Sequence, residues 1–306
     1  MTDRIPPGFF RDAEGRLLVA GRAAEAWVAD AGDTPLFLYD RALLSARVAA
    51  FRAAMPGALG LHYAIKANPF PPLLAHMGGI VDGFDIASGG ELVLALEAGV
   101  APERISFAGP GKRDRELEAA LRAGVILNVE SAGELARAGA IAGRLGVPAR
   151  VALRVNPPFA LKGSGMKMGG VASPFGVDAA DAVPLIRRMQ VAPFRYQGLH
   201  LYAGSQNLSV EAILDSQRQT LALAAELSAE AGAAPPHVNL GGGFGVPYFP
   251  GDRELDLEAL GRGLADLIDG RPAALADTRF VVELGRWLVA GAGVYLCRVI
   301  DRKLSG

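Results

Sequence analysis

Residues 61–108 read LHYAIKANPFPPLLAHMGGIVDGFDIASGGELVLALEAGVAPERISFA and set the pattern for most of the chain. Within this stretch, β-rich runs at Leu61–Ile65, Gly83–Ala87 and Ile105–Ala108 alternate with segments of helical periodicity. Strands that alternate with helices predict a parallel sheet, because each crossover helix returns the chain to the same end of the sheet.

The alternation continues beyond this stretch. Five further β-rich runs lie at Val125–Val129, Val151–Val155, Gly198–Tyr202, His237–Leu240 and Phe280–Leu284. The clearest helical segments are Pro72–Gly78, Gly90–Ala98, Asp114–Ala123, Gly133–Leu145, Ala179–Met189, Val210–Ala231 and Leu255–Asp269. Eight strands in this order favour an α/β fold of the (β/α)8 TIM-barrel type. A doubly wound open sheet is the alternative, because alternation alone does not close a barrel.

Both ends of the chain depart from this pattern. The β-like pieces there are Gly15–Gly21, Pro35–Tyr39, Trp287–Val289 and Val294–Ile300. We expect them to flank the barrel in a small sheet built from both termini. The predicted parts are therefore residues 1–40, which contribute strands to a second β domain, the barrel at 41–290, and the start of an incomplete second β domain at 291–306.

The composition excludes several classes of protein. A hydrophobic content of 51% against 21% charged residues is enough for a packed core, and a net charge of -1 argues against a nucleic-acid partner. No apolar run reaches the roughly 18 residues of a membrane helix, and the N-terminus lacks a signal-peptide layout. We therefore expect a cytoplasmic protein with no membrane partner. The single cysteine, Cys297, is expected to be a sheet-core thiol, and the histidine spacing predicts no metal site.

The chemistry of a TIM barrel lies at the carboxyl ends of its strands, and Lys66 is placed at the first of them. A lysine at an apolar strand end is partly desolvated, which lowers its pKa and makes the amine a nucleophile for Schiff-base chemistry. A lysine that extends to the surface is the commoner alternative.

A run of glycines, GGGFG at Gly241–Gly245, follows the seventh predicted strand. Consecutive glycines allow backbone N–H groups to approach a phosphate without obstruction by Cβ atoms. The run matches neither a P-loop nor GxGxxG, so a plain turn is the alternative.

Three more polar residues are expected at the same end of the barrel. Glu283 and Arg286 follow the last strand, and a carboxylate there can pair either with Arg286 or with a protonated heterocycle nitrogen. His200 can stack on a flat ring or be an ordinary core histidine. Together, an amine, a phosphate loop, a histidine and a carboxylate match the requirements of pyridoxal phosphate.

Eight motifs then carry a resemblance to a known family. The chain resembles the barrel half of the fold-type III PLP-dependent decarboxylases, the group of diaminopimelate, ornithine, lysine and arginine decarboxylases. The residues of its motifs and their spacing are most similar to the diaminopimelate branch, and more similar still to the decarboxylases associated with exosortase and exopolysaccharide loci. The motifs are YAIKAN (Tyr63–Asn68), FDIASGGEL (Phe84–Leu92), ISFAGPGK (Ile105–Lys112), NVES (Asn128–Ser131), LRVNP (Leu153–Pro157), GLHLYAGSQ (Gly198–Gln206), NLGGGFG (Asn239–Gly245) and ELGR (Glu283–Arg286).

The resemblance implies pyridoxal 5'-phosphate (PLP) as the cofactor and three catalytic residues. Lys66 is implied to hold PLP as a Schiff base, His200 to stack on its ring, and Glu283 to pair with its protonated nitrogen. Asp85 and Arg154 are implied to orient these groups. Arg286 is implied to meet either the phosphate or a substrate carboxylate. The other implied cofactor-binding residues are Ser205, Gly241, Gly242, Gly243 and Gly285.

The implied activity is that of a lyase of amino-acid metabolism, which removes the α-carboxylate of an amino acid or diamino acid through a quinonoid. The implied partners are a small amino-acid substrate and, in a full-length protein, a second copy in a homodimer. One alternative is decarboxylation of an aminoacyl group tethered to a carrier protein, with Lys112, Arg113 and Arg115 as candidate docking residues. Another is a non-catalytic PLP-binding barrel. Alanine racemase is a weaker contender because it lacks the GGGFG and ELGR order.

The chain departs from the family pattern in three places. Leu284 replaces a proline, and Ser173–Gly176 replaces a KFG segment, so the 158–177 loop is expected to form a different lid. That lid is predicted to include Lys162, Met166, Lys167 and Met168. The C-terminal sheet domain of the family has no counterpart, which predicts a truncated chain with exposed apolar residues such as Val294, Leu296 and Val299. We expect such a chain to aggregate, or to associate in a way that pairs the exposed edges.

Overall fold

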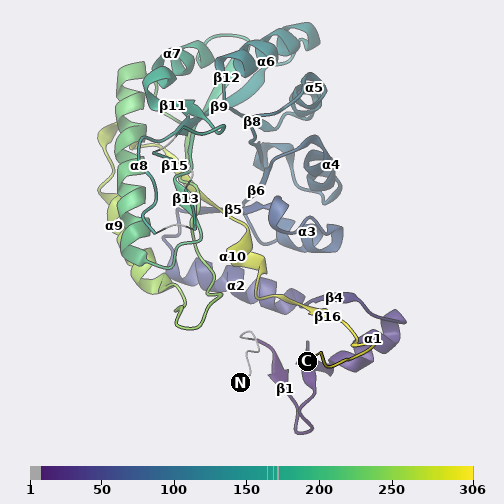
Figure 1. Cartoon of the computed structure of the whole chain (residues 1–306). Helices are drawn as coiled ribbons and strands as arrows, with labels where there is room; N and C mark the ends of the chain where they lie inside the picture. Colours follow the sequence, from purple (N-terminus) through teal and green to yellow (C-terminus); the bar gives the residue numbers. More distant parts are fainter. Residues whose placement is uncertain (1–7, 164, 168, 171, 306) are drawn as a thin grey trace.

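The computed structural model describes residues 8–163, 165–167, 169–170 and 172–305. Its centre is a closed barrel of eight parallel strands surrounded by helices (Figure 1). The pairing of β15 with β5 and of β8 with β9 closes the sheet, so the barrel is confirmed over the open alternative. In their order around the barrel, the strands are β5 (Gly60–Ala64), β6 (Gly83–Ile86), β7 (Ile105–Phe107), β8 (Ile126–Val129), β9 (Ala149–Asn156), β12 (Phe194–Leu201), β14 (His237–Asn239) and β15 (Arg279–Leu284).

A helix follows each barrel strand. Seven of these helices cover the outside of the sheet, whereas the short helix after the last strand lies at the carboxyl end of the barrel. In chain order these helices are α3 (Pro71–Gly78), α4 (Gly89–Glu97), α5 (Asp114–Ala123), α6 (Ala132–Leu145), α7 (Ala179–Met189), α8 (Val210–Ala231), α9 (Leu257–Asp269) and α10 (Arg286–Val289). Short 3-10 turns are η1 (Ile65–Ala67), η2 (Pro102–Arg104) and η3 (Ala273–Leu275). None of the helices in the described part of the chain combines the length and apolar composition needed to cross a bilayer.

Local capping residues set the ends of several of these helices. The side chains of Ser131, Ser209 and Asp256 accept hydrogen bonds from backbone N–H groups in the first turns of α6, α8 and α9. Gly146 and Gly232 end α6 and α8 in the left-handed conformation, which glycine adopts without a Cβ clash. These signals are local in sequence, and the predicted bounds of α8 are those observed.

The strands place apolar and polar side chains on opposite faces. On β5, Leu61 and Tyr63 are fully buried in the apolar core, whereas His62 between them lines a cavity inside the barrel. Strand geometry alternates side chains with a period of two, so the same strand serves the core and the barrel interior.

The two ends of the chain form a flank beside the barrel (Figure 1). It contains the three-stranded sheet β1 (Phe10–Arg11), β2 (Leu17–Val19) and β3 (Arg22–Ala23), and the helix α1 (Ala24–Ala31). Strand β4 (Leu36–Tyr39) pairs antiparallel with β16 (Gly293–Leu296), and α2 (Arg41–Ala54) then leads to the barrel. The prediction of a small sheet built from both ends is therefore confirmed for β4 and β16.

Two predictions for the C-terminal part are wrong. Trp287–Val289 is not a strand but most of α10, in which the N–H of Ala290 donates a hydrogen bond to the carbonyl of Arg286 four residues earlier, as in a helix. Strand β16 ends at Leu296, so Cys297 is an exposed thiol and not a sheet-core residue. Of the apolar residues expected to be exposed at this end, Val299 is 79% exposed, whereas Val294 and Leu296 of β16 are half-buried.

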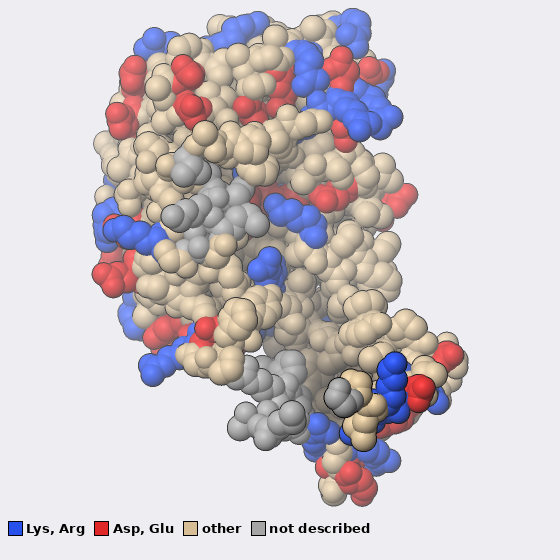
Figure 2. Space-filling view, viewed as in Figure 1, with Lys and Arg blue, Asp and Glu red and all other residues tan. Residues whose placement is uncertain are grey.

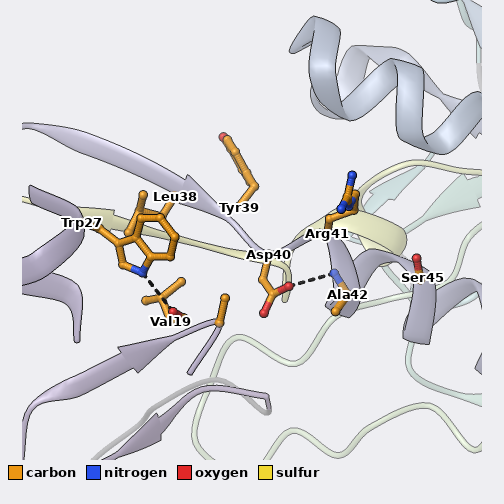
Figure 3. A pocket seen from close by; sticks show the side chains of 9 residues that line it. Val19, Trp27, Leu38, Tyr39, Asp40, Arg41, Ala42 and Ser45 are labelled. Carbon is orange, nitrogen blue, oxygen red and sulfur yellow. Dashed lines mark hydrogen bonds between the residues drawn. The ribbon is translucent and has the colours of Figure 1, made fainter. Parts of the chain in front are cut away.

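A cavity of 380 Å³ lies where the flank meets the start of α2 (Figure 3). The Trp27 indole donates a hydrogen bond to the carbonyl of Val19 at 3.0 Å across one wall. Asp40 caps α2 by accepting a hydrogen bond from Ala42 N at 2.8 Å. The first contact joins α1 to β2 within the flank, and the second fixes the start of α2, which leads to the barrel.

Three short strands lie around the 158–177 loop. Strand β10 (Met166–Lys167) pairs antiparallel with β13 (Gly204–Ser205), and β11 (Val177–Asp178) extends the barrel sheet beside β9. Lys162 is exposed and lies 3.5 Å from Asp215 of α8. The predicted lid residue Met168 lies outside the described residues.

Candidate active site

Each of the eight barrel strands contributes a polar side chain to the barrel interior, in two layers. Asp85, Arg154, His200 and Glu283 line a cavity of 640 Å³ at the carboxyl ends of the strands. His62, Ser106, Asn128 and Asn239 line a separate chamber of 590 Å³ at the amino ends. Interiors of TIM barrels are usually filled by branched apolar residues, so this polar interior marks a functional site.

The upper cavity gathers the predicted chemical groups. Lys66, His200, Glu283 and Arg286 all line it, as do Asp85, Arg154, Ser205, Gly243 and Gly285. They come from seven different segments of the chain, which the closure of the barrel brings to one mouth.

Glu283 and His200 form the buried centre of this cavity. The Glu283 carboxylate lies 3.1 Å from His200 Nε2 and accepts a hydrogen bond from Asn239 Nδ2 at 3.0 Å. Burial opposes ionisation of Glu283, but the charges of His200, Lys66 and Arg154 outweigh it and lower the pKa of Glu283 to about 2. Glu283 is therefore a carboxylate at neutral pH.

Lys66 lies in the turn η1, directly after β5. Its side chain is exposed to the open cavity, which differs from the desolvated lysine expected from the sequence. The reason is that η1 carries Lys66 past the apolar end of the strand. The turn is held by Tyr63, whose hydroxyl donates a hydrogen bond to the carbonyl of Asn68 at 3.0 Å.

Asp85 and Arg154 have partners that the sequence did not indicate. Asp85 Oδ2 lies 3.4 Å from His62 Nδ1, and Arg154 donates a hydrogen bond to Glu130 Oε1 at 3.1 Å. Glu130 also accepts a hydrogen bond from Gly176 N at 3.0 Å. It thus connects the end of β8 with β9 and with the loop that precedes β11.

Phe175 completes this loop contact and was also missed. The guanidinium of Arg154 lies 4.8 Å from the centre of the Phe175 ring, and Phe175 lines the upper cavity. The only sequence signal for Phe175 was its position in the unusual Ser173–Gly176 segment, which by itself does not indicate a partner.

The glycine run does not act as one unit. Gly243 lines the upper cavity, whereas the N–H of Gly241 donates a hydrogen bond to Asn239 Oδ1 at 2.8 Å. Gly242 packs so closely on β15 that an added Cβ would lie 2.1 Å from the carbonyl oxygen of Glu283. Gly241 and Gly242 are therefore used in packing the loop against the barrel, and Gly243 is the glycine of the run that reaches the cavity.

Lys112 is not a surface residue, so the predicted docking patch around it is wrong in this respect. Its side chain is 1% exposed and lies 2.7 Å from Glu134 Oε1. Arg113 and Arg115 are exposed. On the face shown in Figure 2, basic and acidic side chains are interspersed.

Comparison with known proteins gives consistent matches. The family model for the pyridoxal-dependent decarboxylases, pyridoxal binding domain, matches residues 41–290. The chain is 37% identical, over 89% of its length, to a decarboxylase from Niallia circulans that acts on L-glutamyl groups on the BtrI acyl-carrier protein. It is 35% identical, over 96% of its length, to the diaminopimelate decarboxylase of Aquifex aeolicus. The chain spans 64% and 69% of these two relatives, about two thirds of their length.

Solved structures show the same likeness. The diaminopimelate decarboxylase of Helicobacter pylori, in complex with L-lysine, superposes with a TM-score of 0.79 at 31% identity, over 88% of this chain and 68% of that one. The diaminopimelate decarboxylase of M. jannaschii, also with L-lysine, gives a TM-score of 0.85 at 26% identity, over 94% of this chain and 68% of that one.

Proposed function

Because the chain belongs to the pyridoxal-dependent decarboxylases, through their pyridoxal binding domain, and its cofactor is PLP, we propose that it removes the α-carboxylate of an amino acid or diamino acid. The observation that supports this most directly is one cavity that holds a primary amine, a buried imidazole and an ionised carboxylate, from Lys66, His200 and Glu283. This combination suits a cofactor with an aldehyde, a flat ring and a basic ring nitrogen.

The residues present fit PLP. In the described part of the chain, neither ring nitrogen of His200 meets the geometry of a hydrogen bond to another protein group, although the side chain is only 1% exposed. The imidazole lies within ion-pair distance of Glu283, 3.1 Å from its carboxylate, and it lines the cavity, so its ring can pack against a flat cofactor ring. The cavity of 640 Å³ is within the size range of sites for small cofactors.

In this proposal the residues have distinct roles. Lys66 holds the cofactor covalently through its amine, and the flat ring of His200 packs on the ring of the cofactor. Ser205, Gly243 and Gly285 surround the phosphate with small side chains and backbone groups, and Arg286 supplies a positive charge to the phosphate or to a substrate carboxylate.

The proposed reaction depends on keeping the ring nitrogen of PLP protonated. When bound, PLP supplies the conjugated ring that accepts the electrons released at the substrate Cα. The lowered pKa of Glu283 keeps its carboxylate ionised, so it can hold a proton on the ring nitrogen opposite it. Asn239 fixes the direction of that carboxylate through its hydrogen bond. Arg154, held by Glu130, adds positive charge to the lining of the cavity.

The proposal is tested with the chain, PLP and a panel of amino acids. We expect added PLP to give the visible absorbance of a lysine-bound cofactor, and Lys66→Ala to abolish it while the protein stays folded. Release of CO2 is then measured with diaminopimelate, lysine, ornithine, arginine and glutamate. Unchanged visible absorbance in Lys66→Ala would refute the role of Lys66, and PLP binding without CO2 release from any substrate would favour the non-catalytic alternative.

A second candidate is decarboxylation of an aminoacyl group on a carrier protein. The supporting observation is the identity of 37% to the Niallia circulans decarboxylase named above. The discriminating assay compares free glutamate with a glutamyl group loaded on an acyl-carrier protein, at equal concentration. CO2 release only from the loaded carrier protein would favour this candidate over a free amino-acid substrate.

Four sequence-based expectations stay predictions. They are the division into 1–40, 41–290 and 291–306, the homodimer of a full-length protein, the cytoplasmic location, and the association with exosortase or exopolysaccharide loci.

A further inference from the structure

The chamber at the amino ends of the barrel strands is not filled by apolar side chains. Its volume is 590 Å³, and residues near the starts of β5, β9 and β15, such as Gly60, Arg150 and Arg279, form its outer rim. Deeper in the barrel, its wall contains His62, Ser106, Asn128 and Asn239. A polar cavity of this size accommodates water, so polar groups in its wall need not be desolvated completely.

His62 connects this chamber with the upper cavity. It lines the lower chamber, and its Nδ1 lies 3.4 Å from Oδ2 of Asp85, which lines the upper cavity. The two side chains are 15% and 6% exposed. In the described part of the chain, neither carboxylate oxygen of Asp85 has a hydrogen-bond partner, and His62 is the basic group found within ion-pair distance.

The backbone provides the space for this contact. His62 on β5 pairs in register with Gly83 on β6, two residues before Asp85. A Cβ atom at position 83 would lie 2.7 Å from His62 Nε2, so only glycine leaves room for the imidazole against β6. Lys66 follows His62 by four residues, in the turn η1 directly after β5, at the other end of the barrel.

Charged groups on the neighbouring strands favour the imidazolium form. Burial opposes the charge, but Asp85, Glu283 and Asp82 outweigh it, so the pKa of His62 lies above its ordinary value of 6.5. Glu283 stands in register with His62 on the other side, on β15. His237 is the other histidine of the chamber wall, and a charge on His62 disfavours a charge on His237.

We propose that His62 is a positioning residue for the cofactor site, whose imidazolium holds the Asp85 carboxylate in the wall of the upper cavity and neutralises it. The inference rests on the PLP site of the proposed function. Without this cation, the cavity carries an additional unpaired negative charge near the site of an anionic cofactor. His62 thus acts on the cofactor through Asp85, from the far side of the barrel interior.

A double-mutant cycle on PLP binding tests this coupling. The dissociation constant of PLP is measured for the unmodified chain, His62→Gln, Asp85→Asn and the double variant. We expect His62→Gln to weaken PLP binding about tenfold in the unmodified background, because it leaves the Asp85 carboxylate without its cation near an anionic cofactor. In the Asp85→Asn background, the same substitution should change binding less than about twofold.

His237→Gln is the matched control. It removes a histidine from the same chamber wall, whereas the ion pair of Asp85 is with His62, so we expect PLP binding within about twofold of the unmodified chain. The proposal is overturned if His62→Gln has no effect on PLP binding, or if its effect is equal with and without the Asp85 carboxylate.

A second measurement uses the unmodified chain without PLP, so it does not depend on whether a variant folds. The imidazole resonances of the unmodified chain are titrated by NMR, and we expect His62 to lose its proton above pH 6.5. A neutral His62 ring at pH 6.5 would overturn the proposal. Because no reading depends on CO2 release, failure of the decarboxylase proposal and failure of this one are distinguishable.

Discussion

Replacement of Lys112 by methionine tests the buried charges beside the barrel mouth. The ammonium of Lys112 is 1% exposed and donates hydrogen bonds to Glu134 Oε1 at 2.7 Å and to the carbonyls of Gly109 and Asn128, both at 2.8 Å. Lys112→Met fills the same space but leaves the Glu134 carboxylate, 2% exposed, without its cation. Breaking a buried pair in this way costs about 3–5 kcal/mol, so we expect a loss of that size in the free energy of unfolding.

The pair itself is expected to stabilise the fold much less. Burial lowers the pKa of Lys112 and raises that of Glu134, in each case by more than the attraction between them compensates. Desolvation therefore dominates, and removing both charges together avoids the unpaired carboxylate. We expect Lys112→Met/Glu134→Gln to cost about 1–2 kcal/mol, less than Lys112→Met alone.

Urea unfolding followed by circular dichroism measures these differences. Arg115→Met is the matched control, because Arg115 lies exposed near the start of α5, and its effect should stay within about 0.5 kcal/mol. The reasoning is refuted if Lys112→Met costs less than about 1 kcal/mol, or if the double variant is as unstable as the single one.

Substitutions at three other positions have defined expectations. Gly198→Ala should destabilise the fold by more than about 3 kcal/mol, because φ is +125° and the new Cβ would lie 1.8 Å from the carbonyl oxygen of His237; a melting temperature within about 2 °C of the unmodified chain would contradict this. The depressed pKa of Glu283 stabilises the fold above pH 4.5, and this contribution, about 3 kcal/mol, is lost as the pH falls towards 2. Urea unfolding of Glu283→Gln should therefore show a weaker loss of stability between pH 7 and pH 3, and an identical pH dependence would disprove the assignment. Asp256→Ala should cost about 1 kcal/mol in thermal unfolding by removing the cap of α9, whereas Asp256→Asn should be nearly neutral; equal melting temperatures for both would argue against the cap.

Local signals in the sequence determined the barrel and the residues at its mouth. The alternation of β-rich and helical segments predicted the strand order, and caps such as Ser209 and Gly232 defined the ends of α8. The same alternation placed Lys66, His200 and Glu283 after or at the ends of strands, where a barrel assembles its site. These features depend on periodicity and on residues close in sequence, so they can be recognised without a structure.

Only the tertiary structure decided the partners of these residues. His62 and Asp85 are 23 positions apart, Lys112 and Glu134 are 22 apart, and Arg154 and Glu130 are 24 apart. Each pair joins two neighbouring strands of the barrel or the segments that follow them. Its formation depends on how these strands align side by side, and the residues around either partner do not show which side chain will face it. For the same reason, the sequence suggested a surface role for Lys112, whereas the packing of α6 against the end of β8 buries it beside Glu134.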